Sequence, residues 1–138
     1  MRKMLGGGRG SVLVEFALTF PVLMALFLGF CNVVLLLAAK IEAGHAAAEA
    51  ARVASITGSE WQARRAALAR LEQYGQKPEE ASVDVSMSGG WATAHVRIRA
   101  PIIAPGFAAL LGGKPWDKTL EVGERRTAPV TDQLVYKG

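Results

Sequence analysis

The chain has 138 residues, 51% of them hydrophobic, and a formal net charge of +4. Residues 41–138 hold 12 basic and 11 acidic side chains, a net charge of +1, which is too weak a field to hold a polyanion, so nucleic-acid binding is not expected. A single cysteine, Cys31, excludes a disulfide scaffold within the chain.

The first ten residues are basic. Arg2, Lys3 and Arg9 lie there without any acid, which gives +3 of the total charge. Short segments rich in lysine and arginine remain on the cytosolic side of a membrane. We therefore expect residues 1–10 to form a basic leader, with the N-terminus in the cytosol and the C-terminal part on the extracytoplasmic side.

An apolar run follows the leader. Of the 24 residues from Phe16 to Ala39, 20 are apolar and none is charged. As a helix this run would extend roughly 36 Å, against a hydrocarbon thickness of roughly 30 Å. It is longer than the apolar core of a secretory signal peptide, which has about 7 to 15 residues. We therefore expect a membrane span that stays attached to the chain.

The start of the apolar run combines three features. The glycine-rich residues 6–10 are poor helix formers, and Ser11 is suited to cap a helix that begins after it. Glu15 is an acid in an otherwise apolar helix. It is either a boundary acid that reaches headgroup water, favoured by the helix dipole, or a functional group kept near lipid.

These residues resemble a known family. The segment Gly10-Ser11-Val12-Leu13-Val14-Glu15-Phe16 resembles the processing site of type IV pilin-like proteins, and the chain looks like a TadE-like minor pseudopilin of the tight-adherence (Flp) pilus. The alanine-rich block 46–54, with its Glu and Arg, is similar to the stretch that follows the span in this family. Cys31 and Asn32 depart from it, because many members carry an acid and a base near this point.

The resemblance implies a site and partners. A membrane-embedded prepilin peptidase would cut between Gly10 and Ser11, and Glu15, followed by the aromatic Phe16, would pair with the N-terminal ammonium of a neighbouring subunit. Other pilin or pseudopilin subunits and an inner-membrane assembly platform would be the partners. The chain would lie in the bacterial inner membrane by a single pass, with its C-terminal domain in the periplasm, or enter a cell-surface pilus.

Residues 11–56 are expected to form one helix, the span continuing as an alanine-rich stalk. Pro21 is either a harmless kink or a hinge. Ala25 and Gly29 form a small-x-x-x-small pair that would let another helix approach. Glu49 and Arg52, spaced i, i+3, are expected to pair on the exposed side.

Residues 57–138 predict a small α+β head. Thr57 to Ser59 breaks the first helix, and a second helix follows in which Trp61, Leu68, Leu71 and Tyr74 would face the core. Alternating apolar residues on both sides of Gly89-Gly90 predict a β-hairpin. A short helical turn at 104–111 and a third strand near 119–126, with Leu120 and Val122 inward, complete a three-stranded antiparallel sheet packed on the helices, in a pilin-like arrangement.

No enzyme signature is found in the sequence. The glycine-rich start lacks the Lys-Ser/Thr ending of a phosphate-binding loop, and His45 and His95 lie far apart without ligand spacing. We therefore expect no catalysis, metal or cofactor. Two alternatives to a minor pseudopilin stay open: an uncleaved single-pass anchor that scaffolds a secretion or assembly complex, and a head that binds DNA or a surface ligand.

Overall fold

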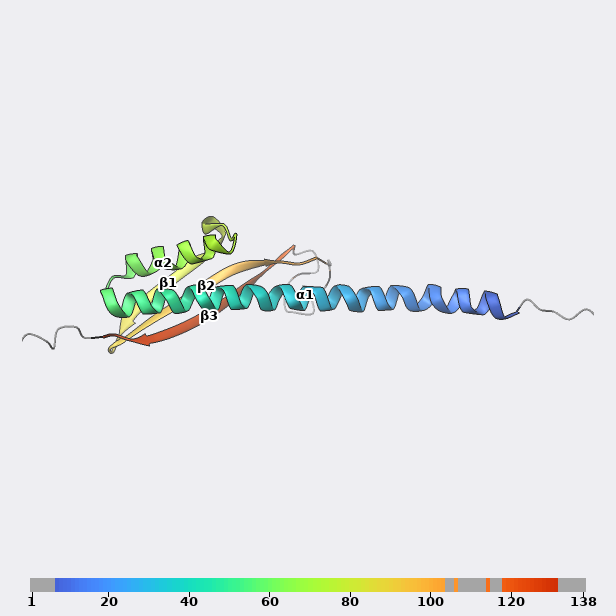
Figure 1. The fold of residues 1–138 in the computed structure, drawn as a ribbon, viewed down its shortest axis with the longest axis horizontal. Coiled ribbons are helices and arrows are strands. Elements are labelled where there is room, and N and C mark those ends of the chain that lie inside the picture. Colours follow the sequence, from blue (N-terminus) through green and yellow to red (C-terminus); the bar gives the residue numbers. More distant parts are fainter. Residues whose placement is uncertain (1–6, 104–105, 107–113, 115–117, 132–138) are drawn as a thin grey trace, which may run out of the picture.

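The computed structural model describes residues 7–103, 106, 114 and 118–131. One long helix extends from a small head that is built on its C-terminal half (Figure 1). The elements in chain order are α1 (Gly7–Thr57), α2 (Glu60–Gln73), the 3-10 turn η1 (Pro78–Glu80), β1 (Ser82–Ser88), β2 (Trp91–Pro101) and β3 (Thr119–Pro129).

Helix α1 is continuous over 51 residues. It passes through Pro21 without ending, because only one backbone hydrogen bond is lost there and the good helix formers Leu23, Met24 and Ala25 follow within the next turn. It also continues past Lys40 into the alanine-rich segment, as the sequence predicts. Its N-terminal half projects free of the head, and its C-terminal half is part of the head (Figure 1).

Helix α2 begins directly after Ser59, as the sequence predicts, but the residues on its inward face differ from the prediction. The hydroxyl of Ser59 caps it by accepting a hydrogen bond from the Gln62 amide at 3.4 Å. The predicted core positions of two aromatic residues are wrong, since Trp61 is 64% exposed and Tyr74 is 39% exposed. They lie under the guanidinium groups of Arg65 and Arg70 instead.

The physical reason is the spacing of the helices. The buried residues of α2 are Ala63, Ala67 and Leu71, which follow one another every four residues on one face. This face meets the alanine-rich part of α1. Small side chains on both helices allow a close approach that leaves no room for an indole ring, so the aromatic side chains lie outside the contact.

The sheet is antiparallel in the order β1-β2-β3. Val83 pairs with Val96 and Val85 with Ala94, so that apolar residues of β1 and β2 share one face. The β1–β2 turn contains Gly89 (φ 60°) and Gly90 (φ 79°), the left-handed conformations that a two-residue hairpin turn requires. Leu120 and Val122 of strand β3 are both half-buried, and Val122 packs against the core.

Both helices cover the same face of the sheet, and the core lies between these two layers. The arrangement is the predicted α+β fold. Most of the buried side chains are alanines, and the largest fully buried apolar ones are Leu71, Ile98 and Val96. The alanine-rich segment of α1 therefore forms one side of the hydrophobic core, called the wall of the core below.

The C-terminal end of the described chain is fastened to the head. The Val130 amide donates to the carbonyl of Gly90 at 2.8 Å, and the Thr131 amide donates to the carbonyl of Ser55 at 3.1 Å. The predicted helical turn at 104–111 lies outside the described residues apart from Gly106.

Candidate functional site

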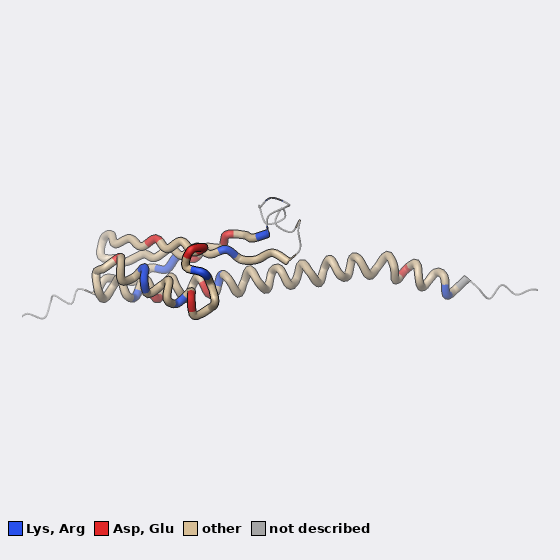
Figure 2. Tube along the Cα trace, turned by 90° about the horizontal axis from the view of Figure 1, so that it is seen from above, with Lys and Arg blue, Asp and Glu red and all other residues tan. Residues whose placement is uncertain are grey.

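The N-terminal half of α1 exposes a large apolar surface, which makes it the candidate functional site. Residues 8–27, called the bare segment below, are exposed throughout. Large apolar side chains such as Phe16 (64% exposed) and Leu26 (69%) have no cover from the chain itself. The bare segment carries two charged residues, Arg9 and Glu15, while the other charged residues that the structure describes gather on the head (Figure 2).

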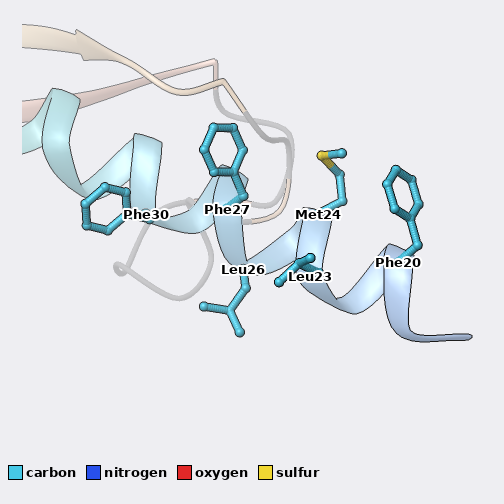
Figure 3. A pocket seen from close by; sticks show the side chains of 6 residues that line it. All are labelled: Phe20, Leu23, Met24, Leu26, Phe27 and Phe30. Carbon is cyan, nitrogen blue, oxygen red and sulfur yellow. The ribbon is translucent and has the colours of Figure 1, made fainter. Parts of the chain in front are cut away.

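The apolar side chains surround the bare segment on all sides. Figure 3 shows Phe20, Met24 and Phe27 projecting on one side of α1 and Leu26 on the opposite side. Together with Phe30 they line an apolar hollow along the helix. A helix that is apolar all round is found inside a large core or inside a membrane. In the part of the chain that the structure describes, α1 is the one helix long and apolar enough to cross a bilayer.

The predicted cleavage site lies inside the helix, which corrects one expectation. Helix α1 begins at Gly7, so Gly10 and Ser11 are already helical and Ser11 does not cap the start. The reason is that a helix can extend by adding one hydrogen bond per residue once it has formed, even through residues of low propensity. These glycines have nothing around them, since a Cβ at Gly8 or Gly10 would meet no atom within 4 Å.

Glu15 and Phe16 lie one turn beyond the cleavage site. Glu15 is exposed and makes no hydrogen bond or ion pair with any residue that the structure describes. The Phe16 ring lies 5.7 Å from that of Phe20, centroid to centroid, on the surface of the helix. Nothing in the described chain therefore compensates the Glu15 carboxylate in an apolar setting.

The two residues of the small-x-x-x-small pair, Ala25 and Gly29, differ in their exposure. Ala25 belongs to the bare segment, whereas Gly29 is buried within the chain. Pro21 lies on the exposed helix between Glu15 and this pair. Only the Ala25 side of the pair is thus open to a neighbouring helix.

Asn32 marks the point where the head reaches the apolar helix. Its side chain is 1% exposed, and its Oδ1 accepts a hydrogen bond from the Ile103 amide at 2.7 Å, across 71 residues of sequence. The Nδ2 group is buried and has no hydrogen-bond partner among the residues that the structure describes. The sequence shows Asn32 only as an interruption of the apolar run, because the residue that it binds lies beyond the end of β2.

Replacement of Asn32 by alanine is expected to loosen this junction. The Ile103 amide loses its acceptor, although deletion of the unpaired Nδ2 offsets part of the cost. We expect the Ile103 amide to exchange with solvent several-fold faster, measured by hydrogen exchange on the full chain in micelles. The Val96 amide, in the middle of β2, serves as the internal control and should exchange at an unchanged rate. Equal exchange at Ile103 in both proteins would contradict the role of Asn32.

The predicted pair on the alanine-rich segment forms. Arg52 Nη2 lies 2.8 Å from Glu49 Oε1. The hydrogen bond from Arg52 lowers the pKa of the Glu49 carboxyl, and the same contact raises the pKa of Arg52. The pKa of Glu49 is lower in the folded state than in the unfolded state. The pair therefore stabilises the fold at pH values above the usual pKa of a glutamate, and this contribution is lost as the pH falls through the lowered pKa.

Two other polar side chains of α1, Glu42 and His45, contact residues in or after α2. The Gln76 side-chain amide donates to Glu42 at 2.9 Å, and the His45 ring stacks on Tyr74 with centroids 6.4 Å apart. Within the described residues, no cluster of three His, Cys, Asp or Glu side chains is arranged to hold a metal ion.

Comparison with known proteins gives one family. A family model described as TadE-like protein matches residues 10–52, and so confirms the resemblance seen in the sequence. The match begins at Gly10 and extends to Arg52, so it covers the bare segment and most of the alanine-rich segment of α1. No curated protein and no solved structure matches the chain.

Proposed function

We propose that this chain is a minor pseudopilin, because residues 10–52 match the model of the TadE-like family, which suggests a pilus-associated structural protein of the tight-adherence system. It is a structural or assembly subunit that enters the membrane by α1 and is cut after Gly10 by a prepilin peptidase. The observation that carries the proposal is the start of the family match at Gly10, five residues before Glu15, the single acid of the bare segment.

The span in this proposal is shorter than the apolar run. The head covers α1 from about Gly29 onward, and a folded sheet with its loops does not lie in lipid. The 20 residues from Ser11 to Phe30 form a helix about 30 Å long, which equals the hydrocarbon thickness of a bilayer. The head then sits at the periplasmic surface, and Glu15 lies about 6 Å inside the cytosolic edge.

Cleavage requires local unwinding of α1. A protease binds its substrate as an extended strand, and the first turns of α1 are the least costly to open, because glycine has a low helix propensity and no side chain packs there. Removal of residues 1–10 takes away Arg2, Lys3 and Arg9, so the side-chain charge falls from +4 to +1. The cut also creates an ammonium group at Ser11.

Glu15 has the role of aligning the subunit during assembly. Its carboxylate lacks a partner among the described residues, and an unpaired charge in lipid is costly. The ammonium of Ser11 on an adjacent subunit, as in pilin-like proteins, would supply a partner of opposite charge and offset this cost. The pair forms only after cleavage, so processing and assembly are coupled.

Two measurements test the proposal. The mass of the protein extracted from membranes should correspond to a chain beginning at Ser11 in cells with a prepilin peptidase and at the initiator methionine in cells without it. Glu15→Leu should be cut normally but should fail to enter assembled pili, whereas the neighbouring control Val14→Leu should behave as the wild type.

These results distinguish a cleaved minor pseudopilin from an uncleaved membrane anchor. An intact N-terminus in a protein that still supports pilus formation would identify an uncleaved anchor, a reading consistent with the unbroken helix through Gly10 and Ser11. Normal incorporation of Glu15→Leu after normal cleavage would leave the pseudopilin assignment standing but would remove the pairing role of Glu15.

A further inference from the structure

The outer face of the sheet, opposite the two helices, is polar and has a distinct composition. Residues of β2 alternate between the core and this face, which places Trp91, Thr93, His95, Arg97 and Arg99 outward. The register sets Asp84 of β1 and Arg125 of β3 on the two sides of His95. This row of acid, imidazole and guanidinium crosses all three strands, and it is called the Asp84–His95–Arg125 row below.

A hollow lies over this row. Its lining includes the row itself and the hydroxyl residues Ser86 and Thr93, which face each other across β1 and β2. Gly123 of β3 contributes to the shape, because a Cβ there would lie 3.0 Å from both Arg97 Cγ and His95 Nε2. The absence of a side chain lets the β2 residues lie across β3.

The charges in the hollow are not equivalent. Arg97 Nη2 holds Asp84 Oδ2 at 2.7 Å and lies 3.3 Å from the Ser82 hydroxyl, and Arg97 Nη1 lies 3.9 Å from Glu121 Oε1. Arg125 makes no ion pair or hydrogen bond with any of the described residues. The hollow therefore combines a fixed carboxylate, whose position is set by Arg97, with a guanidinium that is open to a ligand.

Trp91 stands at the end of the same face. It is 53% exposed and pairs with Ser88 and Pro129, next to the Ser86–Thr93–Thr127 row. A large exposed aromatic ring beside polar groups is a typical feature of binding surfaces, where tryptophan and arginine contribute most of the affinity. Among the described residues, Trp91 does not belong to the hydrophobic core.

We propose that this face binds an acidic saccharide, a sugar ring that bears a carboxylate. Arg125 binds the carboxylate through two parallel hydrogen bonds, while Asp84, Thr93 and Ser86 bind hydroxyl groups as acceptors or donors. Trp91 lies four residues from His95 along β2, about 13 Å away, so the C–H face of another ring of the same oligosaccharide stacks on it. The low net charge of residues 41–138, +1, disfavours a long polyanion held by charge alone.

The full chain in lipid nanodiscs provides the test, with short oligomannuronate as the probe and maltotetraose as the neutral control. We expect saturable binding of oligomannuronate by calorimetry and none of maltotetraose. Trp91→Ala and Arg125→Gln should each weaken binding by about tenfold or more. Arg125→Lys should retain part of the affinity, since lysine keeps the charge but not the paired hydrogen bonds.

Matched controls come from α2, where Trp61 and Arg64 are also exposed. Trp61→Ala and Arg64→Gln should bind as the wild type, and all variants should unfold at the same temperature. The proposal is wrong if oligomannuronate does not bind at millimolar concentration, or if the α2 variants lose as much affinity as the sheet variants. It is also wrong if inorganic polyphosphate competes equally well, because this outcome would identify a general anion site.

Discussion

Leu71→Ala is expected to lower the free energy of unfolding of the head by about 2 to 5 kcal/mol. Leu71 is 0% exposed and is the largest fully buried side chain of the core. Its removal leaves a cavity that neighbouring alanines are too short to fill. Chemical unfolding of the full chain in micelles, followed by tryptophan fluorescence, should show a lower transition midpoint.

Leu68→Ala is the matched control for this loss. Leu68 lies on the same helix and is only half-buried, so less apolar surface returns to water. Its effect should be clearly smaller than that of Leu71→Ala. Equal losses at the two positions would show that the contact of α2 with α1 is not the one described.

Ala47→Leu is expected to be destabilising for the opposite reason. Ala47 is 0% exposed on the face of α1 that forms a wall of the core. The added atoms have no space, and overpacking costs about 1 to 3 kcal/mol or more. Helix α1 would have to move away from the side chains packed against this face. The unfolding midpoint in the same experiment measures this loss.

Ala48→Leu provides a control one residue away. Ala48 is exposed, and leucine has nearly the helix propensity of alanine, so the change should stay within about 0.5 kcal/mol. A similar loss at positions 47 and 48 would contradict the packing of α1 through its alanine face.

The sequence was sufficient for those elements whose signals are local. Alternation of apolar and polar residues around Gly89-Gly90 predicts the hairpin, because the turn and the inward face both depend on near neighbours. The end of α1 and the cap of α2 follow from Gly58 and Ser59 in the same way. The long apolar run predicts the exposed half of α1.

The sequence was not sufficient where distant contacts decide. The sequence pattern predicts that the largest apolar residues of α2 face the core. Close packing of alanines between α1 and α2 instead leaves Trp61 exposed to solvent. The start of α1 was placed too late, because low propensity in Gly7 to Gly10 does not stop a helix already formed. The binding of Ile103 by Asn32 depends on a residue 71 positions away, which no local pattern reports.

The continuity of α1 has a mechanical consequence. A helix of 51 residues is about 77 Å long, and within the described chain it has no break between the bare segment and the wall of the core. Force applied to the head is thus transmitted along one stiff rod to its far end, with no joint to absorb it. Pulling or tilting the head therefore displaces Glu15, at the other end of the rod, by a corresponding amount.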